Sequence, residues 1–255
     1  MTALARIDPA EPAGVASTHG VLAYAIGDIH GCYDLLAAML RRVRDDARRH
    51  AAGRRAVLVL LGDYVDRGPD SARVLTAIAR LSRHGEYELH VLLGNHDACF
   101  LDFIDQPEAG AEWLDFGGRE TLASYGVEPP LSGEEAFGRI RARDDLLERM
   151  PIAHLSLLRR CELMVEIGDY AFVHAGIRPG TALARQGRDD LLWIRGGFLD
   201  AAGPFEKRIV HGHSWTGPDP TVRPERIGLD TGAYETGVLT ALRLDGTEVE
   251  VIQVR

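Results

Sequence analysis

Five short glycine-containing segments of the sequence carry aspartate, asparagine or histidine, the residue types that bind first-row metal ions. The segments are GDIHG (27–31), GDYVDRG (62–68), GNHD (94–97), VHAG (173–176) and IVHGHS (209–214). Their candidate metal ligands are Asp28, His30, Asp63, Asn95, His174 and either His211 or His213. Oxygen and imidazole nitrogen donors without thiolate suit Mn, Fe or Zn. Taken alone, a pair such as Asp28 and His30 has a simpler interpretation, an ion pair on a turn.

The number of candidate ligands indicates two metal ions. Six ligands are too many for one ion that must keep a position open for substrate. Two ions about 3.5–4 Å apart that share a carboxylate form a hydrolytic site. Asp63 is the best candidate for the shared carboxylate, because it is the only acid directly after the apolar run 55–62. We therefore expect two divalent ions per chain, with Mn as the first choice and Fe or Zn as alternatives.

The elements that must position these residues are alternating strands and helices. Short apolar runs at 21–28, 55–63 and 89–95 predict buried strands. Amphipathic patterns at 33–50 and from Pro69 to Gly85 predict the helices between them. Such βαβ units form a parallel sheet that is buried on both faces. Ligand sites in open α/β sheets lie outside the carboxyl ends of the strands, so the polar segments are expected to converge there.

The rest of the chain predicts a helical insertion followed by mainly β structure. Residues 100–160 contain Trp113 and Pro129-Pro130 and show irregular helical patterning, typical of an insertion or cap. Hairpins are expected at 161–176, with a turn at Gly168-Asp169, and at 238–254, with a turn at Asp245-Gly246. We expect a flexible leader over 1–20 and one α/β domain over 21–255, with two sheets flanked by helices.

Composition excludes some classes of partner. The formal net charge of −9 argues against a nucleic-acid or anionic-membrane partner that binds a basic surface. No apolar stretch approaches the roughly 18 residues that a membrane span requires. The cysteines, Cys32, Cys99 and Cys161, are too few and too scattered for a disulfide framework. A cytoplasmic location is expected. The oligomeric state is not indicated.

The ordered motifs GDIHG, GDYVDRG and GNHD, followed by VHAG and GHS, resemble the signature blocks of the PPP-family metallophosphoesterases. That family includes serine/threonine protein phosphatases and symmetrical diadenosine tetraphosphate hydrolases. The resemblance runs from about Val21 to the C-terminus and implies the calcineurin-like fold, a two-sheet sandwich flanked by helices. GNHD in place of GNHE, and LDTGAYETG (229–237) in place of the eukaryotic Ser-Ala-Pro-Asn-Tyr stretch, are typical of a bacterial branch.

The resemblance also implies a role for each site residue. One metal would be bound by Asp28, His30 and Asp63, and the other by Asp63, Asn95, His174 and His213. The preference for His213 over His211 rests on the resemblance alone. His96 would be the general acid, oriented by Asp66, and a metal-activated water would attack phosphorus directly. The phosphate would be bound by Arg67, Asn95 and Arg195, the last from the W-x-R element of LLWIRGGFL (191–199).

Two of these roles have simpler alternatives, and the substrate is open. Asp66 and Arg67 could only pair with each other, and Arg195 could only stack on Trp193. The intact Asp66 favours a phosphorylated protein or peptide as substrate, because the dinucleotide hydrolases tend to read GDLVARG at this block. A dinucleoside tetraphosphate is the alternative. A wall formed by Trp113, Arg119 and Tyr125 could equally stack an adenine or hold a peptide. A catalytically inactive module that binds phospho-ligands is the third choice.

Overall fold

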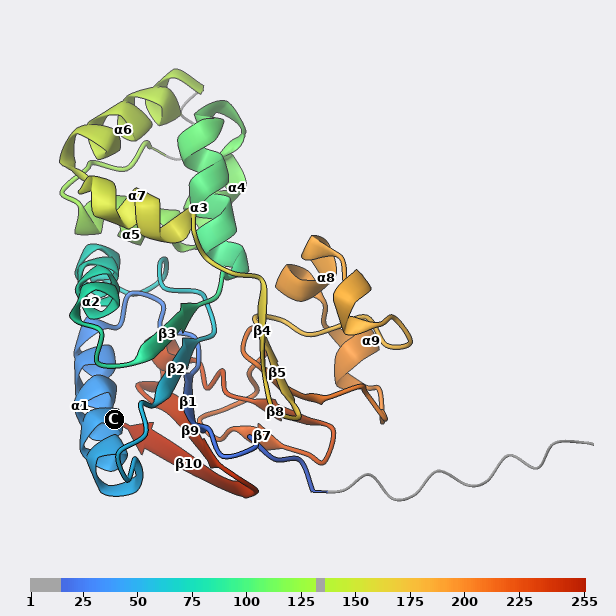
Figure 1. Cartoon of the computed structure of the whole chain (residues 1–255). Coiled ribbons are helices and arrows are strands. Elements are labelled where there is room, and N and C mark those ends of the chain that lie inside the picture. The colour runs from blue at the N-terminus through green and yellow to red at the C-terminus, as the bar shows by residue number, and fades with distance from the viewer. Residues whose placement is uncertain (1–14, 132–135) are drawn as a thin grey trace, which may run out of the picture.

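Two five-stranded sheets form the centre of the protein (Figure 1). The structure is a computed structural model that describes residues 15–131 and 136–255. The first sheet has the order β10-β9-β1-β2-β3. Its strands are β1 (Leu22–Ile26), β2 (Val57–Leu60), β3 (Glu88–Val91), β9 (Leu239–Asp245) and β10 (Glu248–Val254). The strands β1, β2 and β3 are parallel, as the βαβ pattern predicts, and β9 joins β1 in the antiparallel direction.

The second sheet has the order β4-β5-β6-β8-β7. Its strands are β4 (Met164–Ile167), β5 (Tyr170–Val173), β6 (Arg208–His211), β7 (Thr221–Val222) and β8 (Arg226–Gly228). The strands β5, β6 and β8 are parallel, and β4 and β7 close the two edges in the antiparallel direction. The two expected hairpins are present as β4–β5 and β9–β10.

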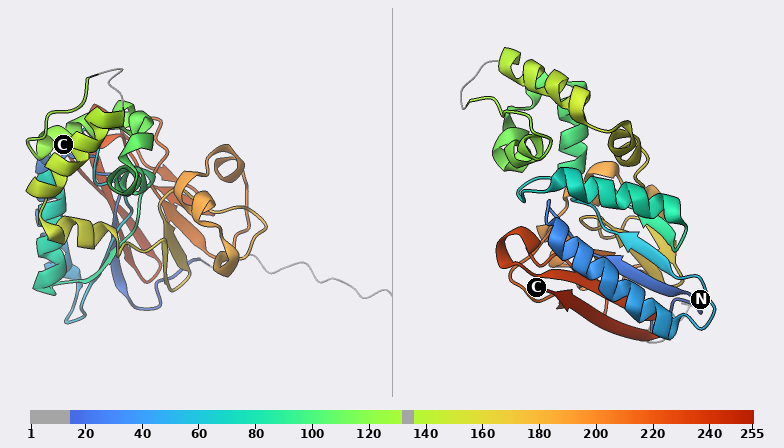
Figure 2. Two further views of the ribbon diagram at one scale, coloured as in Figure 1. Left: turned by 90° about the horizontal axis from the view of Figure 1, so that it is seen from above. Right: turned by 90° about the vertical axis from the view of Figure 1, so that its left-hand side faces the viewer.

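Buried side chains lie in the space between the two sheets and also on the outer face of each sheet, because strand side chains alternate between faces. Ala23, Val59, Phe172 and Val210 are among the buried side chains that join the two sheets. The other face of the first sheet packs against α1 (Tyr33–His50) and α2 (Ser71–His84) (Figure 2). The other face of the second sheet is covered by α8 (Arg188–Trp193) and α9 (Gly196–Leu199). A two-sheet sandwich flanked by helices is therefore confirmed.

A group of helices forms a cap above the carboxyl ends of the first sheet (Figure 1). The cap contains α3 (Asn95–Asp105), α4 (Ala111–Trp113), α5 (Arg119–Ser124), α6 (Ala136–Arg149) and α7 (Ile152–Leu158). A further short helix, α10 (Ala233–Thr236), lies in the loop before β9.

The start of the described chain is tied to the body of the protein. Thr18 is buried, and its backbone N–H donates to the carbonyl of Gly246 at 2.9 Å. Of the leader expected over 1–20, residues 1–14 lie outside the described residues. Within the described part of the chain, no helix combines the length and the apolar character needed to cross a membrane.

His154 of α7 lies buried against α2 and against Tyr125, the residue that follows α5, and we expect it to make stability depend on pH. Its Nε2 lies 3.1 Å from Thr76 Oγ1, and its Nδ1 lies 2.8 Å from the Tyr125 hydroxyl. Burial lowers the pKa of His154 to about 4. The unfolded chain, with an ordinary pKa near 6.5, therefore binds the proton more tightly than the folded chain. The free energy of unfolding should fall as the pH drops from about 6.5 to about 4.

Urea unfolding of the wild type and of His154→Gln between pH 7 and pH 5 measures how much His154 contributes to this fall in the free energy of unfolding. The wild type should lose more stability than the variant over that range, and equal losses would contradict the assignment. Comparing the two proteins removes the contribution of the other buried histidines.

Candidate metal centre

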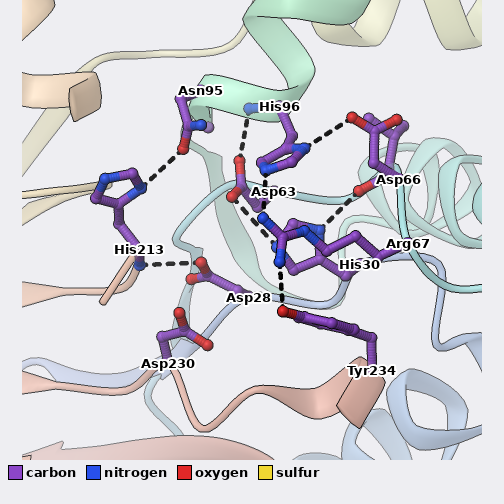
Figure 3. A network of polar contacts seen from close by, with 12 residues as sticks. Asp28, His30, Asp63, Asp66, Arg67, Asn95, His96, His213, Asp230 and Tyr234 are labelled. Atoms are coloured by element: carbon purple, nitrogen blue, oxygen red, sulfur yellow. Dashed lines mark hydrogen bonds and ion pairs between the residues drawn. The ribbon is translucent and has the colours of Figure 1, made fainter. Parts of the chain in front are cut away.

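The side chains expected to bind metal meet at the edge where the carboxyl ends of the two sheets lie together (Figure 3). Each follows a strand: Asp28 and His30 follow β1, Asp63 follows β2, and Asn95 begins α3 after β3. His174 follows β5 and His213 follows β6. All six are buried. The structure thus brings together residues that are up to 185 positions apart in the chain.

The backbone turns sharply at these residues. His30, Asp63 and His213 have φ values of 44°, 52° and 63°, in the left-handed region that non-glycine residues rarely adopt. Such strain concentrates at functional sites and persists where the surrounding contacts enforce it. Gly94 and Gly212 allow the close approach, since a Cβ on either would overlap the carboxylate of Asp63 or of Asp28.

Asp97 holds two of these loops together, a role that the sequence did not reveal. Its carboxylate accepts hydrogen bonds from the backbone N–H groups of Asp63 at 2.8 Å, Tyr64 at 3.0 Å and Gly94 at 3.0 Å. The loops after β2 and β3 are therefore fixed relative to each other. The only sequence signal was an acid in the first turn of α3.

Asp63 lies between two groups of potential ligands. His30, Asp63 and His96 place one donor atom each within 4.8 Å of one another, and so do Asp63, His174 and His213. Asp63 Oδ2 is 3.4 Å from His30 Nε2, whereas Oδ1 is 3.5 Å from His174 Nε2. The two oxygens thus face different groups, an arrangement compatible with a carboxylate shared by two ions.

Asn95 completes the second group. Its side-chain oxygen lies 2.8 Å from His174 Nε2 and 2.8 Å from His213 Nδ1. His211, the alternative ligand, is turned away: its Nε2 lies 3.3 Å from an Arg226 nitrogen, and its ring packs on Phe198. The two histidines differ because β6 ends at His211 and His213 lies in the following turn.

The charges of the site fit divalent cations. Burial lowers the pKa of His30 and of His213 to about 3, which keeps both imidazoles neutral and able to bind a metal. Burial, with the neighbouring carboxylates of Asp230 and Asp63, raises the pKa of Asp28. Asp28 Oδ2 accepts from the His213 backbone N–H at 2.9 Å, but among residues 15–131 and 136–255 the buried Oδ1 has no hydrogen-bond partner. A buried acceptor without a donor is costly unless a cation satisfies it.

Asp230 was not anticipated from the sequence, although LDTGAYETG drew attention to its loop. It is 5% exposed, and burial raises its pKa to about 6. It lies beside Asp28, so that carboxylates crowd this side of the site (Figure 3). Divalent ions would offset that charge.

His96 is oriented by Asp66, as the resemblance implies for a general acid. His96 Nδ1 lies 2.8 Å from Asp66 Oδ2, which leaves Nε2 on the side of His30 and Asp63 (Figure 3). Burial acts to lower the pKa of His96, but Asp63 and Asp66 outweigh it and raise that pKa. The alternative pairing of Asp66 with Arg67 is not what the described residues show, since the Asp66 carboxylate contacts His96, Trp113 and Thr121.

The two arginines lie on different sides of the candidate metal ligands. One Arg67 nitrogen is 3.2 Å from His96 Nε2, another donates to the Tyr234 hydroxyl, and the guanidinium carbon lies 4.7 Å from the Tyr234 ring centre. Arg195 donates from Nε to His213 Nε2 at 3.0 Å. Trp193 lies close to His213 and is half exposed. Both guanidinium groups can thus reach a phosphate placed over the site.

The expected substrate wall is only partly present. Trp113 is buried against Phe100 and Phe103, and Tyr125 contacts His154. Only Arg119 of the three lines the cavity beside the site. The interpretation of Trp113 as a substrate contact is therefore wrong, because its indole faces Asp66 inside the cap.

The fold and the site together define a metal-dependent phosphoesterase. Residues 23–236 match the family described as calcineurin-like phosphoesterases, and the chain belongs to that family. This confirms the resemblance noted from the motifs. Members of the family use divalent metals, which agrees with the ligand groups around Asp63.

Individual relatives carry two kinds of name. A symmetrical bis(5'-nucleosyl)-tetraphosphatase of Dechloromonas aromatica is 35% identical over 64% of this chain, and the match spans 46% of that protein's length. Serine/threonine-protein phosphatase 1 of Salmonella typhimurium is 27% identical over 87% of this chain and 91% of its own. A crystal structure described as a candidate diadenosine tetraphosphatase superposes with a TM-score of 0.61, at 21% identity over 96% of both chains.

Proposed function

We propose that the protein hydrolyses dinucleoside polyphosphates, and that diadenosine tetraphosphate is cleaved symmetrically into two molecules of ADP. The observation that carries this proposal is a cavity of about 470 Å³ beside the candidate metal ligands. Arg67 and Tyr234 line both the cavity and the site, so a group bound in the cavity can be continuous with a phosphate at the metals. This reverses the order of the two substrates expected from the sequence.

The chemistry of the cavity suits a nucleoside. Phe116 lines the cavity and is 62% exposed, and Tyr234 lines it as well. Exposed aromatic rings stack on nucleobases regardless of base identity. Asp115 and Glu120 add acceptors for ribose hydroxyl or base amino groups. The Dechloromonas relative, named for this substrate class, supports the proposal independently.

The residues of the site provide each remaining part of hydrolysis. Two divalent ions, with Mn as the first choice, would supply Lewis acidity and an activated water. Arg67 and Arg195 hold the phosphate oxygens and offset the charge that develops on them. As the water oxygen bonds to phosphorus, the bond to the leaving oxygen breaks and its electron pair stays on that oxygen. His96 then donates the Nε2 proton to the leaving oxygen, and the attacking water releases one of its protons to the surrounding solvent.

A second candidate is a phosphorylated protein side chain. It is supported by the Salmonella phosphatase, which matches over nearly the whole of both chains. The same residues would then act on a phosphomonoester, and the cavity would accommodate part of the peptide.

The two substrates can be compared directly in the Mn²⁺-supplied protein. We expect kcat/KM for diadenosine tetraphosphate to exceed that for a phosphothreonine peptide by at least about tenfold, with ADP as the product. Preference for the peptide would overturn the proposal, and AMP with ATP as products would overturn symmetrical cleavage.

A variant of the cavity wall tests the nucleoside site itself. Phe116→Ala should raise KM for diadenosine tetraphosphate by roughly 5- to 100-fold, the cost of one lost base stack. Hydrolysis of 4-nitrophenyl phosphate should hardly change. Phe137→Ala is the matched control, because Phe137 is an exposed phenylalanine of the same cap that does not line the cavity. An unchanged KM in Phe116→Ala would place the nucleoside elsewhere.

A further inference from the structure

We propose that Trp113 and Thr121 of the cap are positioning residues that orient the proton donor His96 through the carboxylate of Asp66. The inference rests on the proposed role of His96 as general acid. It does not depend on whether the substrate is a dinucleotide or a phosphoprotein.

The carboxylate of Asp66 is held by the cap from two sides. Asp66 is fully buried. Trp113 Nε1–H donates to Asp66 Oδ2 at 3.0 Å and makes a second contact to Oδ1 at 3.2 Å. The Thr121 hydroxyl donates to Oδ1 at 2.7 Å. These donors fill the other directions around the carboxylate, so that the remaining acceptor position of Oδ2 faces His96 Nδ1 at 2.8 Å.

Both cap residues are themselves rigidly placed. The Trp113 indole lies against the rings of Phe100 and Phe103, with ring centres 5.4 Å and 4.4 Å away. Gly118 makes room for the indole, because a Cβ at this position would overlap it. Thr121 is fully buried, and its hydroxyl also accepts from the Asp66 backbone N–H at 2.9 Å. The donors that fix Asp66 therefore have little freedom of their own.

The cap also holds the unusual backbone of this loop. Asp66 and Arg67 have φ values of 71° and 69°, in the left-handed region. The Arg67 backbone N–H donates to the carbonyl of Gly117 of the cap at 3.3 Å. Outside the cap, the hydroxyl of Ser71, the first residue of α2, lies 3.2 Å from the Asp66 backbone nitrogen. Aspartate tolerates this region better than most residues, but arginine does not, so the conformation of Arg67 depends on such contacts.

One short segment links this support to the substrate cavity. Trp113 and Thr121 bracket residues 114–120, and six of these seven residues line the cavity. The segment that would contact the substrate is thus anchored at both ends on the residue that orients the proton donor. A substrate that fits the cavity therefore meets His96 in a fixed orientation relative to its leaving group.

Leaving-group dependence tests the proposal, since a proton donor matters most when the leaving group is basic. The variants are Trp113→Phe, which keeps an aromatic ring of smaller size but removes the N–H, and Thr121→Val, which keeps the shape but removes the hydroxyl. With phenyl phosphate, we expect kcat to fall about 10- to 100-fold in each variant while KM stays unchanged. With 4-nitrophenyl phosphate, whose leaving group departs without protonation, the loss should be severalfold smaller.

Controls separate positioning from a general loss of structure. Thr121→Ser retains the hydroxyl and should recover most of the activity. Tyr125→Phe removes a hydroxyl of the same cap that contacts His154 and not Asp66, and it should leave both substrates unaffected. Thermal unfolding and bound-metal content, measured on every variant, identify any protein that fails to fold or to bind metal.

A double-mutant cycle with His96→Asn decides the outcome. If the cap residues act through His96, Trp113→Phe and Thr121→Val should cause no further loss in the His96→Asn protein. Equal losses on both aryl phosphates, or additive losses in the cycle, would overturn the proposal. Both probes are aryl phosphates, so this result does not depend on whether the natural substrate is a dinucleotide. The proposed dinucleotide specificity is tested separately, by the comparison of diadenosine tetraphosphate with the phosphopeptide.

Discussion

Replacing Asp63 by asparagine is expected to lower hydrolysis by about three orders of magnitude. Asp63 is the residue that both ligand groups share, with Oδ2 near His30 and Oδ1 near His174. Asparagine keeps one side-chain oxygen, but its amide NH₂ would face the other group and can only donate. One metal ion should therefore be lost or weakly held.

Asp63→Asn is expected to change metal binding and hydrolysis without disturbing the fold. Asp63 has a φ of 52°, and asparagine tolerates the left-handed region better than most residues. Metal content should fall below two ions per chain while the unfolding temperature of the metal-free protein changes little. Asp105→Asn is the matched control, an exposed acid paired with Arg159 away from the site. Full metal content with full activity in Asp63→Asn would refute the bridging role.

Those parts of the fold that depend on local pattern could be predicted from the sequence. The apolar runs and amphipathic helices of the first hundred residues gave the parallel strands β1, β2 and β3. The turns at Gly168-Asp169 and Asp245-Gly246 gave the two hairpins. The pairing of β9 with β1 could not be predicted, because Ile26 and Ala241 are far apart in the chain and no local signal sets their register.

In the candidate site too, residues that follow a local pattern could be predicted and residues that depend on long-range contacts could not. Asp28, Asp63 and His174 could be anticipated because each directly follows an apolar strand, and the geometry of parallel strands makes such ends converge. Trp113, Thr121 and Asp97 could not, because their roles depend on which long-range partner each side chain meets. A tryptophan in a helical insertion gives no sign that its N–H reaches a carboxylate 47 positions earlier.

His96→Asn is the variant that separates the two roles open to this histidine. His96 Nδ1 contacts Asp66, as a general acid requires, yet Nε2 lies with His30 and Asp63 in one of the two ligand groups. As a general acid it contributes about 10²- to 10⁴-fold to the rate, so kcat should fall by that factor while two metal ions remain bound. As a ligand, its loss would also release metal.

Metal content and kinetics of the same preparation therefore decide between these roles. A large loss of kcat with two ions retained assigns His96 to proton transfer, because the phosphate is still bound and polarised but its leaving oxygen departs unprotonated. A loss of one ion would place His96 among the ligands, and Asp66 would then orient a metal-binding imidazole. Asp28, whose buried Oδ1 has no hydrogen-bond partner in the described part of the chain, would in that case be the residue whose role must be reassigned.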